Sequence, residues 1–240
     1  MNRFHKTILA SSLLTMTGLA QAEISGNVGM VSDYKFRGVS QTDNSIALQG
    51  GFDYAHDSGL YVGTWMSNVD SSFFNADGTD PQLEMDFYVG YAGEYNDFGY
   101  DLSLVQFQYS GCDDCDTTEL YLSGSYSIFT ATFAYTPEIG YLGDTSSDGA
   151  WYLSLGAETE FTPGWTVHGS VGYSAGEFFD NLGAGVPSSY MDYSVGVATS
   201  FQGVDLDLSW IDVDSDGDEI FGNSDALTDG RLILSVSKSF

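Results

Sequence analysis

The sequence predicts an all-β protein: an antiparallel transmembrane β-barrel of about 12 strands with short periplasmic turns and longer extracellular loops. Two observations lead to this fold class. Apolar and polar residues alternate through most of the chain, as in Leu83–Tyr91 and Val204–Trp210, and this is the period of a strand with one apolar face. The connections between these stretches alternate between short and long, which is typical of bacterial membrane barrels.

The first 22 residues predict a secretory signal peptide. A basic start at Met1–Lys6 precedes a short apolar run and the small-residue cleavage pattern Ala20-Gln21-Ala22. The apolar run is shorter than the roughly 20 residues that a membrane-spanning helix needs. We therefore expect residues 1–22 to be cleaved and residues 23–240 to form one outer-membrane β-barrel.

Alternation and turn residues divide the mature chain into twelve expected strands. They are residues 24–37, 45–56, 60–69, 82–96, 99–110, 117–128, 130–137, 150–162, 165–175, 189–201, 204–213 and 230–240. The even-numbered connections hold one to three residues, with turn chemistry such as Asp57-Ser58-Gly59 and Gln202-Gly203. The odd-numbered connections hold six to sixteen residues. An even strand number places both ends of the barrel in the periplasm.

Aromatic residues on the apolar faces collect at two heights, as expected for the two interfaces of a membrane. Beside the short turns lie Phe52, Tyr54, Tyr95, Tyr100, Phe161, Trp165, Phe201 and Phe240, and beside the long loops lie Tyr34, Phe36, Trp151, Tyr173 and Trp210. The last stretch, Leu232 to Phe240, resembles the terminal signature that the outer-membrane assembly machinery recognises, although Lys238 departs from it. A soluble sandwich would alternate as well, but would show no such belts.

Charge restricts the choice of partners. The mature chain carries 34 acidic and four basic residues, a formal charge of −30. Such a chain repels nucleic acid and attracts cations. Lipid of the outer membrane and small hydrophilic solutes or cations are the expected partners.

Two cysteines, Cys112 and Cys115, lie in one expected loop. In an exported protein a disulfide is expected. A redox role or a metal-thiolate pair remains open, but the first would need a helix N-terminus and the second two more soft ligands.

Several segments resemble the TorF family of porins. The opening match is Val31-Ser32-Asp33-Tyr34-Lys35-Phe36-Arg37-Gly38-Val39-Ser40-Gln41-Thr42, and later blocks include Gly63–Val69, Glu84–Tyr91 and Asp229–Phe240. The similarity spans nearly the whole mature chain. It implies an outer-membrane barrel that serves as a channel, with no settled substrate.

The polar faces predict the chemistry of the barrel interior. Twelve strand carboxylates and only three bases face inward, so a water-filled lumen is expected, because so many buried charges cannot all pair. The bases Lys35, Arg37 and Arg231 fall near the outer rim at the closure of strands one and twelve. Four acids begin inward-running strands at similar height: Glu84, Asp86, Glu119 and Asp192. We expect a pore constriction that is basic on one side and acidic on the other, or, equally, local pairing that only stabilises the seam.

Two other constellations are weaker. The residues Asp212, Asp214, Asp216 and Asp218 resemble the start of a calcium loop, but Asn223 replaces its final glutamate, so a solvated acidic loop is favoured over a weak Ca²⁺ site. Some twelve-stranded barrels are phospholipases with a Ser–His pair facing lipid. Neither His56, near Ser58, nor His168, beside Ser170, has a convincing nucleophile on that side.

These observations predict a porin-like channel without a cofactor for passive diffusion of small hydrophilic solutes, with a preference for cations. A phospholipase-like barrel enzyme and a structural or adhesin barrel without transport remain as alternatives. The first would require a lipid-facing nucleophile, and the second longer and better ordered loops.

Overall fold

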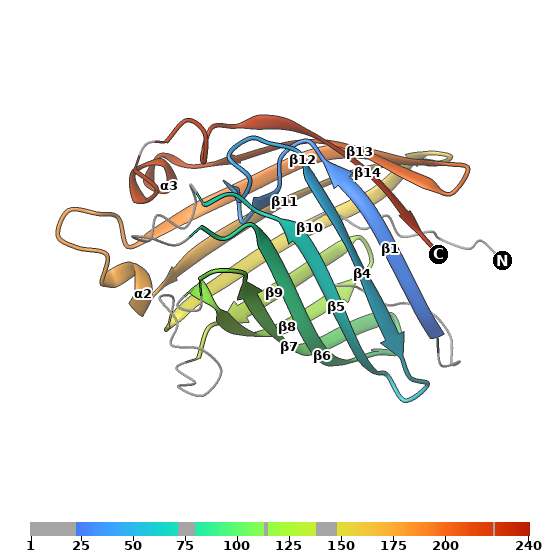
Figure 1. Ribbon diagram of the computed structural model, residues 1–240. Helices are drawn as coiled ribbons and strands as arrows, with labels where there is room; N and C mark the ends of the chain where they lie inside the picture. The colour runs from blue at the N-terminus through green and yellow to red at the C-terminus, as the bar shows by residue number, and fades with distance from the viewer. Residues whose placement is uncertain (1–22, 72–79, 113–114, 138–147, 223) are drawn as a thin grey trace.

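The computed structural model describes residues 23–71, 80–112, 115–137, 148–222 and 224–240, so the expected signal peptide lies outside the described residues. Twelve antiparallel strands form a closed barrel (Figure 1). They are β1 (Glu23–Val31), β4 (Ala47–Ala55), β5 (Leu60–Asn68), β6 (Leu83–Tyr95), β7 (Phe98–Tyr109), β8 (Thr117–Tyr126), β9 (Phe129–Tyr135), β10 (Ala150–Thr162), β11 (Trp165–Gly176), β12 (Ser189–Phe201), β13 (Val204–Val213) and β14 (Arg231–Ser239). The predicted fold class is confirmed.

The barrel closes between its first and last strands. Strand β1 pairs with β14 from Asn27↔Ser239 to Val31↔Ser235, and with β4 along its whole length. Because every strand has two neighbours, closure leaves no unpaired edge within the barrel.

Tight turns lie at one end of the barrel and long connections at the other. The C-terminus and the β4–β5 and β12–β13 turns share the right-hand end of Figure 1. Residues with positive φ, such as Asn96, Gln202 and Gly203, form several of these turns. The short helices α2 (Glu177–Asp180) and α3 (Ser215–Ile220) lie at the opposite end. No helix among the described residues is long and apolar enough to cross a membrane.

The outer surface of the barrel is apolar. In β8, Leu120 and Leu122 are 42% and 56% exposed, whereas the alternating Glu119 and Tyr121 are 5% and 7% exposed. The same alternation exposes Leu48, Val195 and Leu234 on other strands. An apolar surface on every strand is the pattern of a barrel surrounded by lipid.

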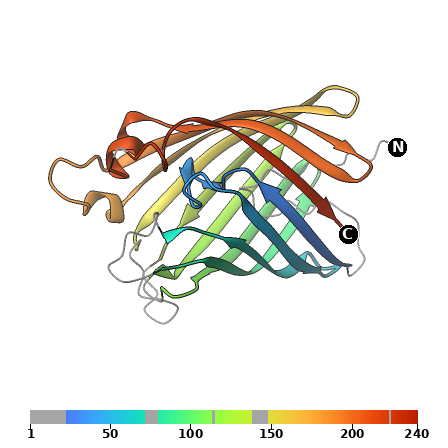
Figure 2. The ribbon, with the colours of Figure 1, turned by 45° about the horizontal axis from the view of Figure 1, so that its top comes forward.

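The structure corrects the course of the first strand. Strand β1 ends at Val31 and not at residue 37, and the chain from Asp33 to Thr42 turns into the barrel. There β2 (Lys35–Phe36) and β3 (Val39–Ser40) form a small hairpin, which we call the inner hairpin. The blue segment between β1 and β4 lies within the outline of the barrel in both views (Figure 1 and Figure 2). Tyr34 and Phe36 are therefore interior residues and not part of an outer aromatic belt.

Local chemistry explains the inner hairpin. Its two turn residues, Arg37 and Gly38, have φ of 49° and 83°, as in the type I′ turn of two-residue hairpins. The buried Asp33 carboxylate accepts hydrogen bonds from Ser40 Oγ at 2.5 Å and Thr42 Oγ1 at 3.1 Å. The backbone N–H of Ser40 also donates to the Leu227 carbonyl at 2.8 Å, which ties the hairpin to the loop before β14.

The inner hairpin fills the barrel at its own level. Val39 packs with Tyr190, Val213 and Leu227, while Phe36 packs against a cluster that includes Phe107 and Tyr121. The sequence predicted a water-filled lumen throughout. At this level the interior is instead a packed core, because a loop that the sequence placed on the wall occupies the space.

Candidate functional site

The tip of the inner hairpin reaches the wall opposite its own strand. Arg37 donates to both carboxylate oxygens of Glu119 on β8, from Nη1 at 3.0 Å and from Nη2 at 2.6 Å. Strands β8 and β10 flank β9, which is the strand opposite β1 in the ring of twelve. The ion pair therefore joins the hairpin tip to the opposite wall of the barrel. It is bidentate, which is the strong geometry for a guanidinium and a carboxylate.

Aromatic residues enclose the Arg37 guanidinium. Its central carbon lies 4.6 Å from the centroid of the Phe36 ring and 4.5 Å from that of Tyr152 on β10. Nη2 also donates to Tyr121 Oη at 3.3 Å. Burial is the largest single influence and opposes the charge, but Glu119, Tyr121 and Tyr190 together outweigh it and raise the pKa of Arg37, so the residue stays a cation.

Three further carboxyl groups are linked to this ion pair or to its neighbours. Glu84 on β6 accepts a hydrogen bond from Tyr34 Oη at 3.1 Å. Asp86, two residues later, interacts electrostatically with Glu84 and Glu119. Asp192 on β12 interacts with Arg37 and accepts a hydrogen bond from Tyr152 Oη at 3.3 Å.

These carboxylates outnumber the bases at their level. Glu84, Asp86, Glu119 and Asp192 are all at most 7% exposed. Asp86 Oδ1 and Asp192 Oδ2 are buried with no hydrogen-bond partner among the described residues. Four buried carboxyl groups therefore gather at the level of one guanidinium, and of these Glu119 and Asp192 interact with it directly.

The other two predicted bases stay near the closure of the barrel. The Lys35 ammonium donates to the carbonyl oxygens of Asp229 at 2.8 Å and Gly38 at 3.2 Å. Burial lowers the pKa of Lys35, the nearby Arg231 lowers it further, and Asp33 acts in the opposite direction. Arg231 Nη2 donates to the Asp225 carbonyl at 3.0 Å and lies 3.9 Å from Asp229 Oδ2.

The structure thus differs from the predicted arrangement of the constriction. The four acids do gather at one level, and Lys35 and Arg231 do lie near the seam. Arg37 does not, because the chain leaves the wall after Val31 and carries Arg37 across to the acidic side. The prediction that the three bases form one cluster is therefore wrong. Of the three bases, Arg37 alone bonds to one of the four predicted acids.

Between this level and the turn end, the inner wall is acidic. Tyr88 Oη donates to Asp53, and Tyr61 Oη donates to Asp101 Oδ2 at 2.7 Å. Among the described residues this part of the inner wall carries no lysine or arginine, because Lys238 lies on the same face of β14 as the exposed Leu232 and Leu234 and so faces outward. Its carboxylates include Asp53, Glu94, Asp101, Glu158, Glu160, Asp205 and Asp207.

The predicted histidines have different settings. His168 lies on the inner wall, and its Nε2 is 2.6 Å from Asp207 Oδ2. His56 lies in the exposed β4–β5 turn, where its Nδ1 is 2.9 Å from Ser58 Oγ. The first pair faces away from lipid, and the second lies at the turn end of the barrel.

The four acids that resemble the start of a calcium loop have different partners. Asp214 caps α3 by accepting from the Gly217 N–H at 3.0 Å, while Asp212 accepts from Tyr193 Oη at 3.1 Å. Only Asp218 of the predicted set lines the polar pocket that it shares with Asp225, Thr228 and Asp229. Within the described part of the chain no group of three or more acidic, cysteine or histidine residues is arranged to hold a metal ion.

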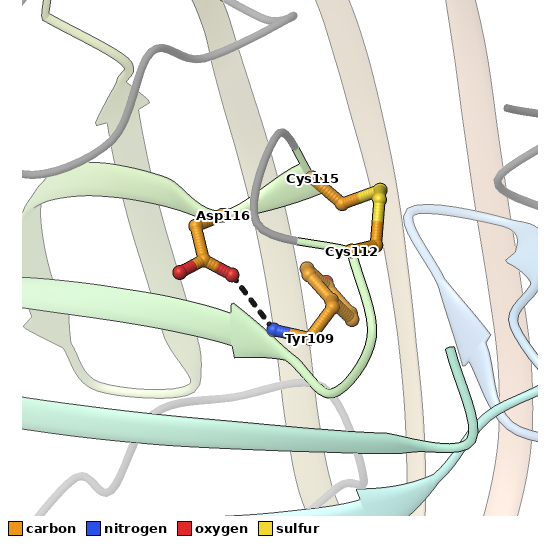
Figure 3. Close-up of a disulfide and its surroundings, with 4 residues drawn as sticks. All are labelled: Tyr109, Cys112, Cys115 and Asp116. Carbon is orange, nitrogen blue, oxygen red and sulfur yellow. Dashed lines mark hydrogen bonds between the residues drawn. A yellow bond between two sulfur atoms is a disulfide. The ribbon is translucent and has the colours of Figure 1, made fainter. Parts of the chain in front are cut away.

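The two cysteines are joined in a disulfide at the tip of the β7–β8 connection (Figure 3). Beside it, the Tyr109 N–H donates to Asp116 Oδ1 at 2.8 Å. The bond closes a loop that lies far along the chain from the inner hairpin.

Sequence reasoning missed the aromatic part of this site. Tyr152 and Tyr121 alternate with outward residues, so their inward position was predictable, but nothing near them indicates a guanidinium partner. The signal for the hairpin itself was Arg37-Gly38, a pair that fits a tight turn when Gly adopts positive φ.

Comparison with known proteins places the chain in a family and supports the fold. The model of the family described as "Bacterial protein of unknown function (Gcw_chp)" matches residues 16–240, so the chain belongs to this family. No curated protein matches the sequence.

Solved structures of outer-membrane barrels are similar in fold. The KdgM porin in complex with disordered oligogalacturonate shares 11% identity over 90% of this chain and 98% of that chain, with a TM-score of 0.54. An outer membrane channel from Pseudomonas putida F1 shares 10% identity over 93% and 97%, with a TM-score of 0.50. The outer membrane phospholipase A from Escherichia coli shares 11% identity over 93% and 98%, with a TM-score of 0.46. Identities this low show the fold alone, a barrel of the outer-membrane type.

Proposed function

We propose that this member of the Gcw_chp family is an outer-membrane channel for small hydrophilic solutes, with a preference for cations. The acidic inner wall carries the proposal. From the inner hairpin to the turn end, the described wall residues include carboxylates on five strands and no lysine or arginine. A ring of carboxylates in a solvated passage attracts cations and repels anions.

The solvent exposure of several of these carboxylates supports a solvated passage in the periplasmic half. Glu94 and Glu160 are exposed, and Glu158 and Asp205 are half-buried, although all alternate with lipid-facing residues. A carboxylate that faces the inside of a barrel and is still accessible lies next to water. The resemblance of residues 31–42 to the opening motif of TorF porins supports the same role.

In this proposal the inner hairpin sets the constriction. It fills the lumen near the extracellular end, and its tip is fastened to the opposite wall by the Arg37–Glu119 pair. Solutes pass where the hairpin leaves room or when its tip is released. The rate of passage therefore depends on how strongly the tip is held.

Reconstitution in planar bilayers tests the channel directly. In a gradient of KCl, we expect a reversal potential of the sign that indicates selectivity for K⁺ over Cl⁻. The triple variant Glu94→Gln/Glu158→Gln/Asp205→Asn should move this potential toward zero. Lys238→Gln, which changes one charge on the outer face, is the matched control and should leave it unchanged.

The test separates the alternatives. Folded protein that inserts without conductance would contradict the channel. Release of fatty acid from phospholipid by that same preparation would then favour an enzyme, for which His56 and Ser58 are the pair to substitute. Conductance with anion selectivity would contradict the role given to the inner wall.

A further inference from the structure

The Arg37 side chain occupies a site with the features of a guanidinium receptor. Glu119 presents both oxygens to the planar fork, and Tyr152 and Phe36 lie near its carbon at 4.5 and 4.6 Å. A bidentate carboxylate combined with aromatic faces is how proteins recognise guanidinium groups in preference to ammonium groups. Most of these groups belong to the barrel wall and not to the hairpin.

The site holds more hydrogen-bonding capacity than Arg37 uses. Asp86 and Asp192 are 7% and 6% exposed, and each keeps one buried oxygen without a hydrogen-bond partner among the described residues. Both interact electrostatically with the pair, Asp86 with Glu119 and Asp192 with Arg37. Buried carboxyl oxygens without a partner next to a bound guanidinium are acceptors for the further N–H groups of a guanidinium-bearing ligand.

The position of the site connects it to transport. The Arg37 tip is the part of the inner hairpin that touches the opposite wall, and it touches this site. A solute with its own guanidinium group could take the same place on Glu119, Tyr121 and Tyr152. Binding of the solute and release of the hairpin tip would then compete for one set of groups.

We infer that the constriction is a binding site for guanidinium-bearing organic cations, occupied in the resting protein by Arg37 as a tethered ligand. The role of these cations as transported solutes rests on the proposed channel function, whereas binding itself does not. Putrescine and agmatine distinguish the two parts of the recognition, because agmatine carries a guanidinium in place of one putrescine ammonium.

The test empties the site and supplies the ligand from solution. Arg37→Asn removes the guanidinium, and asparagine tolerates the positive φ of 49° at this position. In detergent micelles, calorimetry should show agmatine binding to this variant at least about tenfold more tightly than to the natural protein. Adding Glu119→Gln should abolish the gain, and putrescine should bind at least about tenfold more weakly than agmatine.

Arg231→Gln is the matched control, because it removes an arginine that bonds to a backbone carbonyl and not to this site. It should not create agmatine binding. Equal binding of agmatine to Arg37→Asn and to the natural protein, or binding that survives Glu119→Gln, would overturn the inference.

The test remains decisive if Arg37→Asn folds poorly. Agmatine should then raise the fraction that refolds into the heat-modifiable barrel band on a gel, and putrescine should not; rescue by neither compound would overturn the inference. Bilayer recordings keep the two proposals apart. Agmatine binding by a protein that does not conduct would leave the site standing and contradict transport, and conductance without agmatine binding would do the reverse.

Discussion

Substitution of Glu119 by glutamine tests whether one ion pair holds the inner hairpin across the barrel. The change removes the charge that faces Arg37 and keeps the size of the side chain. Arg37 and Glu119 side chains are only 14% and 6% exposed, so the guanidinium cannot recover the lost partner by turning to bulk water. Removing one partner of a buried ion pair costs about 3–5 kcal/mol.

The lower end of that range applies here. The amide carbonyl of the introduced glutamine could still accept one hydrogen bond, and the rings of Phe36 and Tyr152 still face the cation. A cost of about 3 kcal/mol raises the ratio of released to docked hairpin roughly 150-fold, since each 1.4 kcal/mol is a factor of ten. The barrel strands are untouched, so the loss applies to docking of the hairpin and leaves the wall folded.

Single-channel recording measures the outcome. We expect Glu119→Gln to increase the open time or the conductance, while the heat-modifiable band of the folded barrel persists. Glu219→Gln, which changes an exposed acid on α3, is the matched control and should behave as the natural protein.

A double-mutant cycle identifies the cause. In Arg37→Asn/Glu119→Gln neither member of the pair is left charged without its partner, so the loss of thermal stability should be smaller than the sum of the two single losses. Additive losses, or a Glu119→Gln variant with unchanged conductance and stability, would refute the idea that this pair fastens the hairpin.

Three further predictions concern the hairpin and its surroundings. Gly38→Ala should release the hairpin tip and raise conductance without changing a charge, because a Cβ at this position, where φ is 83°, would lie 2.5 Å from Val213 Cγ1. Gly203→Ala controls for backbone strain alone, since φ there is 75° and no atom lies within 4 Å of the added Cβ; equal effects of the two substitutions would contradict the clash. Burial lowers the pKa of Lys35, so the ammonium group holds its proton more tightly in the unfolded chain, and the stability of the fold should rise with pH as the pH approaches 10.5. Lys35→Met should flatten this rise in thermal melts recorded below pH 10, and an unchanged slope would argue against a buried ammonium. Replacing Cys112 and Cys115 by serine should lower the free energy of unfolding by about 2 kcal/mol or less, because the disulfide closes only a short loop, and should leave conductance unchanged. Altered ion selectivity would show that this loop reaches the passage.

Strand positions could be predicted closely because their signal is local. Residues 150–162, 189–201 and 204–213 were predicted with the bounds that the structure shows for β10, β12 and β13. Alternation sets which side chains face inward, and hydrogen bonding to two neighbours forces closure once every strand has an apolar face. The level at which Glu84, Asp86, Glu119 and Asp192 gather follows from strand direction and turn length.

The inner hairpin escaped prediction for a physical reason. Residues 32–37 continue the alternation of β1, so the sequence pattern does not mark the point where the chain leaves the sheet. That point depends on Asp33 accepting from Ser40 and Thr42, and on Ser40 N–H meeting the Leu227 carbonyl, 187 residues away. The contact with Leu227 exists only after the barrel has closed.

The sequence by itself determined the barrel, its orientation of short turns and long loops, and the acidic character of its interior, because each depends on residues near one another in the chain. Only the tertiary structure decided what the interior contains. It placed Arg37 against Glu119 and Tyr152, from strands on the far side of the ring, since a closed barrel brings together residues that no local pattern relates. Arg37, which the sequence placed at the closure of strands one and twelve, therefore forms its ion pair on the opposite side of the barrel.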